Sequence, residues 1–307
     1  MDVSTTTGLL IAADCADEDG YRRAFDKYVA AGFRWLDYGM GNMSGRYPAF
    51  GDAMLYTDRW RRWYAEARNY CGKRNAGFNQ THNLMHNYFA GTLETETWNR
   101  LTDRAIEATA LLGAAVNIMH PVAPPGKEGD VRACLRANVD FFRARGETAA
   151  KFGVTIAVEN MLSTRMADGT VCRRYCDNVE NLCELVDAVG MPNVKICLDT
   201  GHLHYMGEAV LASVTRIQQH LVALHIHDND RLSDAHIAPY GGTFDWEELY
   251  RALASIRYQG FFTLEGLHAC KKLPDALQRS MLGYLLDLGS WMAFNVKSRE
   301  SALYGKA

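Results

Sequence analysis

Four residues with metal-binding side chains stand at the carboxyl ends of apolar runs in this sequence. They are three carboxylates and one imidazole: Glu159, Asp199, His227 and Glu265. A donor set made mostly of oxygen suits Mn²⁺, Mg²⁺, Co²⁺ or Fe²⁺ better than a structural zinc site rich in thiolates. It also leaves coordination positions for the oxygens of a substrate, so the sequence predicts a catalytic divalent-metal site.

The segment 221–230, LVALHIHDND, offers two histidines for this site. His225 and His227 project to the same side of the predicted strand because they are two residues apart. His227 lies nearer the carboxyl end of that strand. We therefore expect His227 to be the ligand and His225 to support it from below.

Eight apolar runs of strand length recur along the chain, and each ends in a residue that can ionise or bind metal. The runs are TGLLIAAD, FRWLDYG, AGFNQTH, AAVNIMHP, VTIAVEN, VKICLDTGH, LVALHIHDND and GFFTLEG. The polar residues that end them are Asp14, Asp37, His82, His120, Glu159, Asp199, His227 and Glu265.

The segments between the runs have helical character. In 131–153 and 177–193, apolar residues recur at helical spacing, and glycines mark the helix ends at Gly153 and Gly190. Strands that alternate with helices predict a parallel sheet, and eight such units favour a closed barrel. No GxGxxG or GxxxxGK[ST] loop supports a nucleotide-binding sheet instead. We expect one α/β domain over residues 1–307, a single (β/α)8 TIM barrel with a C-terminal helical tail from about residue 271.

In such a barrel the carboxyl ends of all strands meet on one face, where active sites lie. The polar strand ends would then converge on one cavity. Burying several carboxylates together without a cation is costly, and a divalent metal would satisfy them. Segment 39–60 is predicted to be a lid or an oligomer contact.

Composition and charge narrow the possible partners. The formal net charge is −3, which gives no overall attraction for nucleic acid or anionic membranes. The arginine-rich segment 58–70 is predicted to be an amphipathic barrel helix with its aromatic residues packed inward or on a second subunit. The start of the chain has no signal-peptide pattern, and the eight cysteines form no CxxC pair. We expect a cytoplasmic protein with free thiols and no membrane partner.

Several segments resemble a known family. IAVENM, CLDTGH, HIHDND followed by DAHIAPYGGTFDW, and FFTLEG are similar, in this order, to the signature segments of the xylose isomerase-like TIM barrel superfamily. The likeness is to its sugar phosphate isomerase/epimerase branch, and it extends from about residue 8 to 270. It implies an isomerase or epimerase that acts on a small carbohydrate.

The resemblance also implies roles for individual residues. It makes Glu159, Asp199, His227 and Glu265 the ligands of one divalent ion, with Mn²⁺ as the first expectation and Mg²⁺, Co²⁺, Fe²⁺ or Zn²⁺ as alternatives. Glu159 and Glu265 become the pair that exchanges a proton beside a carbonyl. The remaining residues are expected to contact substrate: His82, His120, His202, His236 and Asn160. Asn160 has an equal alternative, which is to tie a strand to a loop.

Two other reactions remain open. Related barrels are lyases or dehydratases of keto-sugars, keto-inositols and C-glycosides, and these also begin with proton abstraction. Endonuclease IV, an apurinic-site phosphodiesterase of the same superfamily, holds three zinc ions. Its pattern can be followed here through the histidines and carboxylates above together with Asp234. We also expect assembly as a homo-oligomer or with a different subunit.

Overall fold

Eight parallel strands form one sheet in the computed structural model, which describes residues 1–10, 18–40, 54–166, 168–266, 268–270 and 273–305. The strand order is β10-β1-β2-β3-β4-β5-β8-β9. The strands are β1 (Val3–Thr6), β2 (Trp35–Gly39), β3 (Gly77–His82), β4 (Val116–Met119), β5 (Thr155–Glu159), β8 (Val194–Asp199), β9 (Leu221–His225) and β10 (Phe262–Leu264).

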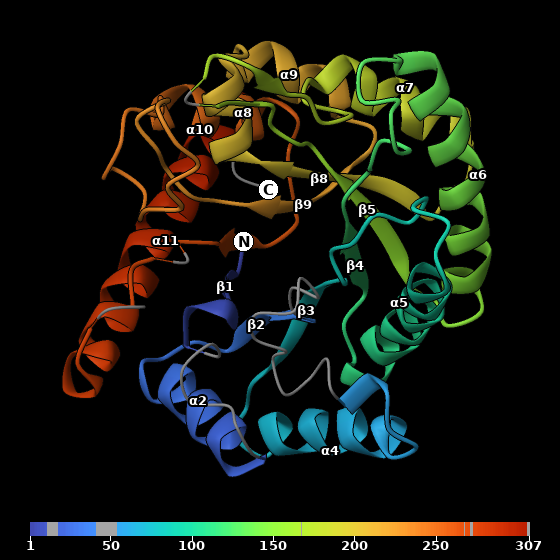
Figure 1. The fold of residues 1–307 in the computed structure, drawn as a ribbon. Helices are drawn as coiled ribbons and strands as arrows, with labels where there is room; N and C mark the ends of the chain where they lie inside the picture. The colour runs from blue at the N-terminus through green and yellow to red at the C-terminus, as the bar shows by residue number, and fades with distance from the viewer. Residues whose placement is uncertain (11–17, 41–53, 167, 267, 271–272, 306–307) are drawn as a thin grey trace.

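The sheet closes between β10 and β9, the two strands at the ends of this order. Just beyond β9, the Ile226 amide donates to the Thr263 carbonyl at 2.8 Å, and the Glu265 amide donates to the Ile226 carbonyl at 2.8 Å. Figure 1 shows the resulting ring of strands with helices around it. The predicted TIM barrel is confirmed.

The helices that cover the barrel begin and end at residues suited to those positions. Asn178 caps α7 by accepting a hydrogen bond from the Asn181 amide, and Gly190 ends the helix in the left-handed conformation that glycine adopts most readily. The helix predicted from residue 131 ends at Ala150, three residues before Gly153. The helices are α2 (Glu18–Ala30), α4 (Trp60–Gly72), α5 (Leu93–Leu112), α6 (Val131–Ala150), α7 (Val179–Val189), α8 (Thr200–Met206), α9 (Val210–Ile217), α10 (Trp246–Ser255) and α11 (Asp275–Tyr304).

The first strand differs from its prediction. The run TGLLIAAD was expected to form it, but β1 lies earlier, at Val3–Thr6, and residues 8–10 are helical. A run this short and apolar fits a helix as well as a strand. The observed strand is polar, and its hydroxyls are satisfied inside the barrel: Ser4 donates to Thr263 Oγ1 at 2.8 Å and Thr5 donates to the Leu264 carbonyl at 3.1 Å. Asp14 lies outside the described residues.

Segment 58–70 behaves as an amphipathic barrel helix. Trp60, Trp63 and Tyr64 of α4 are buried, whereas Arg61 and Arg62 are exposed.

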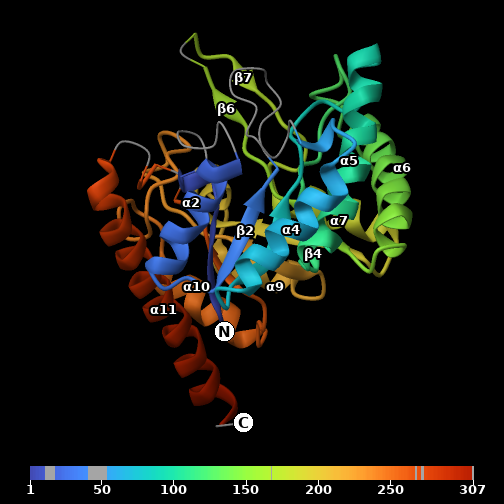
Figure 2. The ribbon, with the colours of Figure 1, turned by 90° about the horizontal axis from the view of Figure 1, so that it is seen from below.

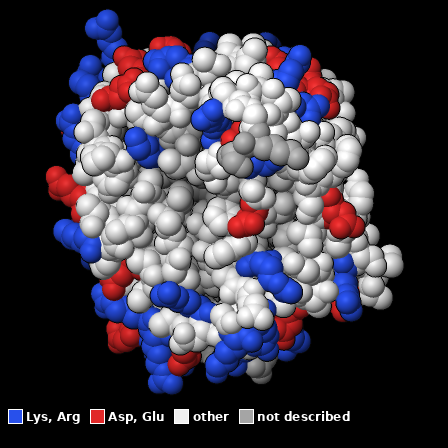
Figure 3. All heavy atoms as spheres, turned by 180° about the vertical axis from the view of Figure 1, so that it is seen from behind, with Lys and Arg blue, Asp and Glu red and all other residues white. Residues whose placement is uncertain are grey.

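Of segment 39–60, which was predicted to be a lid or an oligomer contact, residues 41–53 lie outside the described residues. On the face shown in Figure 3, side chains of both charges are scattered around the rim. No helix in the described parts of the chain is long and apolar enough to cross a membrane.

One excursion from the barrel stands above the carboxyl ends of the strands. After β5 the chain forms a short antiparallel hairpin, β6 (Thr164–Arg165) and β7 (Val171–Cys172), before α7 begins. Figure 2 shows this hairpin projecting from the barrel on the side to which β2 points. It therefore lies on the face where the polar strand ends converge.

Candidate active site

Three of the four predicted metal ligands lie together at the mouth of the barrel. Glu159, Asp199 and Glu265 form one buried group with His225, in which a donor atom of each residue lies within 4.8 Å of the others. His225 Nδ1 is 3.1 Å from Glu159 Oε1 and 3.4 Å from Glu265 Oε2. The ends of β5, β8, β9 and β10 each supply one member of this carboxylate group.

His225 occupies the position predicted for His227. The register of the sheet pairs His225 with Asp199, so His225 lies at the height of the carboxylates and His227 lies two residues further out. A shift in this register between Ile196 and Cys197 sets that height, and the amino-acid pattern gives no sign of it. The structure therefore groups His225 with the three carboxylates, whereas the sequence favoured His227, and the identity of the histidine ligand stays a prediction.

His225 is held from its other side by a carboxylate in the middle of β2. Its Nε2 lies 3.1 Å from Asp37 Oδ2, and both residues are fully buried. Such a partner orients an imidazole and fixes which of its nitrogens faces the other ligands. Asp37 was predicted to face the cavity, but its contact with His225 was not.

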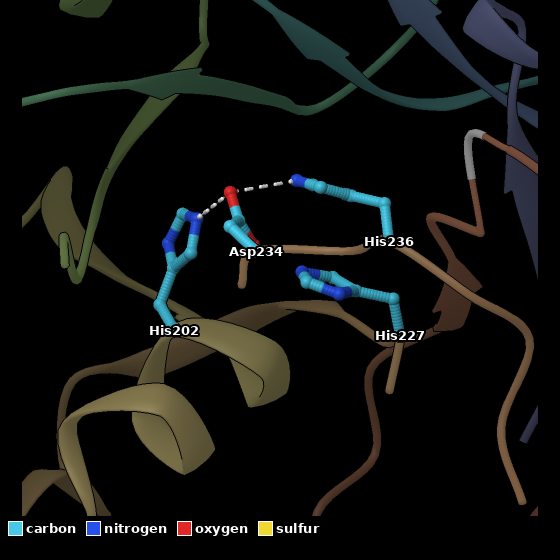
Figure 4. A group of neighbouring side chains, drawn as sticks. All are labelled: His202, His227, Asp234 and His236. Carbon is cyan, nitrogen blue, oxygen red and sulfur yellow. Dashed lines mark hydrogen bonds and ion pairs between the residues drawn. The ribbon is translucent and has the colours of Figure 1, made fainter. Parts of the chain in front are cut away.

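His227 joins a second group, which Figure 4 shows. Its Nε2 lies 3.0 Å from Asp199, and its ring stacks on that of His236 with centroids 3.8 Å apart. Asp234 Oδ2 lies 3.2 Å from His236 Nε2 and 3.6 Å from His202 Nε2. The structure thus brings together His202 and His236, both expected to contact substrate.

The loop that carries Asp234 and His236 is tied down by Asp228. The Asp228 carboxylate is buried and accepts hydrogen bonds from the Phe244 amide and from Trp246 Nε1, each at 3.2 Å. Its backbone pairs with Ile237 in both directions. Asp228 is therefore a structural anchor, a role that the sequence alone did not indicate.

A third group lies on the other side of Glu159. His120 Nε2 is 3.1 Å and His82 Nε2 is 3.4 Å from Glu159 Oε2. The two histidines come from β3 and the end of β4, as predicted. Glu159 is thus shared between this group and the carboxylate group.

The contacts of Asn160 favour the tie between strand and loop. Its side-chain amide donates to the Asp199 carbonyl at 3.0 Å, and its side-chain oxygen accepts from the Asp199 amide at 2.7 Å. Its backbone carbonyl accepts from His202 Nδ1 at 2.7 Å. Asn160 therefore fixes the positions of two site residues.

The electrostatic environment separates the two glutamates. Burial opposes ionisation of Glu159, but the neighbouring His225 and His120 lower its pKa well below the usual value. Burial raises the pKa of Glu265. Burial also disfavours charge on His225, yet the carboxylates of Glu265 and Glu159 raise its pKa well above the usual value. Two carboxylates whose pKa values are shifted in opposite directions are typical of acid/base pairs.

A cavity of about 270 Å³ opens over these groups, and we call it the inner chamber. Side chains from all three groups line it, including Glu159, Glu265, His120, His202 and His236. A small polar molecule in this chamber would contact carboxylates and imidazoles on several sides.

Comparison with known proteins gives the family. The family model of the xylose isomerase-like TIM barrel matches residues 25–286. The chain belongs to this family. The resemblance predicted from the signature segments is confirmed.

Curated relatives include proteins with a named activity. D-psicose 3-epimerase of Enterocloster bolteae is 29% identical over 143 residues, which cover 45% of this chain and 41% of that protein. The uncharacterized protein y4fM of Sinorhizobium fredii is 26% identical over 274 residues, 79% of each chain. In the D-psicose 3-epimerase and in a probable ketose 3-epimerase of Synechocystis, the matched stretch covers less than half of the protein's length.

Solved structures share the fold at low identity. An L-ribulose 3-epimerase superposes with a TM-score of 0.74 at 13% identity and covers 100% of this chain and 99% of that chain. A D-tagatose 3-epimerase-like protein superposes with a TM-score of 0.70 at 19% identity and covers 95% and 100%.

Proposed function

We propose that the protein is a sugar epimerase that depends on one divalent metal ion and removes and returns a proton beside the ketone of a keto-sugar. The observation that carries this proposal is the buried carboxylate group of Glu159, Asp199, His225 and Glu265, of which Glu159 and Glu265 line the inner chamber. The named relatives are ketose 3-epimerases, which supports the same reaction class.

The donors fit a divalent ion. The carboxylate group contains three buried carboxylates and one imidazole, and none of the three carboxylates has an ion pair with Lys or Arg in the described part of the chain. Carboxylate oxygens with one imidazole nitrogen suit Mn²⁺ first, and Mg²⁺, Co²⁺, Fe²⁺ or Zn²⁺ as alternatives. The proposed ligand set therefore contains His225 where the sequence had indicated His227.

The reaction needs an acid and a base on the protein. When bound, the metal polarises the carbonyl and hydroxyl oxygens of the sugar and so acidifies the C–H bond between them. Glu159, whose pKa is lowered, is ionised and accepts that proton. Glu265 reaches the cavity from a different strand, and its raised pKa favours the form that returns a proton. His82, His120, His202 and His236 are proposed to contact the sugar hydroxyls.

Exchange of solvent deuterium into candidate ketoses tests this mechanism. We expect exchange with the metal-loaded protein, and a loss of about 10²- to 10⁴-fold in Glu159→Gln and Glu265→Gln. Glu180→Gln is the matched control, because Glu180 is an exposed carboxylate that pairs with Arg216 on the outer surface. Exchange that persists in both active-site variants would show the mechanism to be wrong.

A lyase or dehydratase would share this first step. Its product would lack water or an aglycone, and NMR of the reaction mixture separates it from an epimer. Release of water or of the aglycone, without formation of a new sugar epimer, would show that the reaction is an elimination and not an epimerisation.

A three-metal phosphodiesterase is the second candidate, and a specific observation favours it. The groups around Asp234 and around His82 and His120 each offer at least three possible ligands beside the carboxylate group. Elemental analysis of the purified protein decides between the candidates. About one Mn²⁺ per chain supports the epimerase, whereas three zinc ions with cleavage of an apurinic-site duplex would support the phosphodiesterase.

A further inference from the structure

A second cavity adjoins the inner chamber. It measures about 340 Å³, and we call it the outer chamber. The same four side chains line both cavities: Met85, His120, Met161 and Arg174. Two of them are methionines, whose unbranched side chains change conformation easily. A molecule longer than a single sugar can therefore extend from one chamber into the other.

The outer chamber differs from the inner one in charge. Arg173 and Arg174 line it, and within the described residues neither guanidinium has an ion pair or a hydrogen bond to another side chain. Its one carboxylate, Glu128, accepts a hydrogen bond from the Gly126 amide at 3.1 Å. The inner chamber, by contrast, holds several carboxylates. A negative group on a substrate would be attracted to the outer chamber, where two guanidinium groups face a single carboxylate.

The arginines stand on a hydrogen-bonded ribbon that continues from the strand of Glu159. The Met161 amide donates to the Cys176 carbonyl at 2.8 Å, and the Arg174 amide donates to Ser163 Oγ at 2.9 Å. Ser163 is buried and donates in turn to Asp177 at 2.5 Å. The same chain segment thus supplies a proposed catalytic carboxylate and, after the hairpin of Figure 2, a cationic wall.

We propose that the outer chamber binds an anionic substituent of the substrate, a phosphate or a carboxylate, while the ketone end occupies the inner chamber. The inference rests on the proposed epimerase function and names its substrate class, an acidic keto-sugar. Arginine forms two parallel hydrogen bonds with either anion, which would also orient the sugar. Neutral ketoses would lack this contact.

Deuterium exchange with three matched probes tests the inference: fructose, fructose 6-phosphate and fructuronate. We expect kcat/KM for at least one anionic probe to exceed that for fructose by about 10- to 100-fold. In Arg173→Gln/Arg174→Gln this advantage should disappear. Arg165→Gln is the matched control, because Arg165 lies on the same hairpin but lines neither chamber, and it should retain the advantage.

The outcomes separate this inference from the proposed function. A preference for fructose 6-phosphate identifies the anion as phosphate, and a preference for fructuronate identifies it as carboxylate. Equal exchange of all three probes, or an equal loss for all three in the double variant, overturns the inference and leaves the epimerase proposal intact. If no probe exchanges, the epimerase proposal fails on these substrates. Calorimetric binding of fructose 6-phosphate to wild type and the double variant then tests the chamber directly, and equal affinities would overturn it.

Discussion

His225 and His227 are separated by one pleat of a strand, and each contacts a different set of side chains. His225 lies between Asp37 and Glu159, whereas His227 contacts Asp199 and stacks on His236. A period of two residues places both on the same side of the strand, and their heights depend on the pairing of β9 with β8. The carboxylates could be chosen from the sequence because each is the polar residue that closes its run. The histidine could not, because a pattern of residue types does not contain the register.

Substitution of each histidine tests this assignment. We expect His225→Gln to weaken Mn²⁺ binding about 100-fold or more, because it removes a ligand of the carboxylate group. His227→Gln should weaken the same binding by about tenfold or less, since His227 only contacts the ligand Asp199. Titration calorimetry measures both affinities, and circular dichroism verifies folding. The reverse order of effects would return the ligand role to His227.

Asn160 offers a test of structure against substrate binding. Asn160→Ala leaves the buried amide and carbonyl of Asp199 without their side-chain partners, so we expect a loss of about 1–3 kcal/mol in the free energy of unfolding. Urea denaturation of the metal-free protein measures it. Unchanged stability together with a higher KM would instead assign Asn160 to the substrate.

The turn from β8 into α8 allows one helix to approach the site closely. A Cβ atom on Gly201 would lie 1.9 Å from Cε1 of His227, so only glycine fits at this position. We expect Gly201→Ala to displace the His227 ring and to lower the free energy of unfolding by about 1–3 kcal/mol.

Gly283→Ala is the matched control for that substitution. Gly283 lies inside α11 with open space around its Cα, so alanine there should raise the free energy of unfolding by about 0.5–1 kcal/mol. Thermal unfolding compares the two variants. Equal effects would show that the contact with His227 is not decisive.

At the level of elements, seven of the eight predicted runs contain an observed strand. The eighth strand, β1, lies outside its predicted run for a physical reason. Six of the seven are apolar along most of their length, as strands buried on both faces are, whereas the run AGFNQTH ends in four polar residues. The strand β1 is made of Val3, Ser4, Thr5 and Thr6, and the buried hydroxyls of Ser4 and Thr5 are satisfied by β10. That compensation depends on a partner 259 residues away in the sequence, so no local pattern reveals it.

The molecule as a whole draws its site from the entire circumference of the barrel. Each of the eight strands, or the segment that follows it, supplies a residue to the inner chamber, so folding and site assembly are the same event. The eightfold alternation of strand and helix was sufficient to predict this architecture. The groupings within the cavity depend on side-chain distances, which the order of elements does not fix.

Metal binding should therefore stabilise the whole barrel. With free Mn²⁺ at 100 times its Kd, we expect the free energy of unfolding to rise by about 2.7 kcal/mol, because only the folded chain assembles the ligands. Differential scanning calorimetry measures the rise in Tm, with Glu159→Gln as the control that should show a smaller one. A wild-type Tm that does not change when Mn²⁺ is added would contradict the metal site.

Glu159 faces the carboxylate group through one oxygen and the histidines of β3 and β4 through the other. A shared carboxylate makes the occupancies of its two sides depend on each other. Whatever factor a metal ion on one side imposes on the binding of substrate at the histidines on the other must be returned in equal measure, since the coupling is reciprocal. A titration of this protein with metal is thus expected to give a different affinity when substrate is present, and Glu159 is the residue that couples the two.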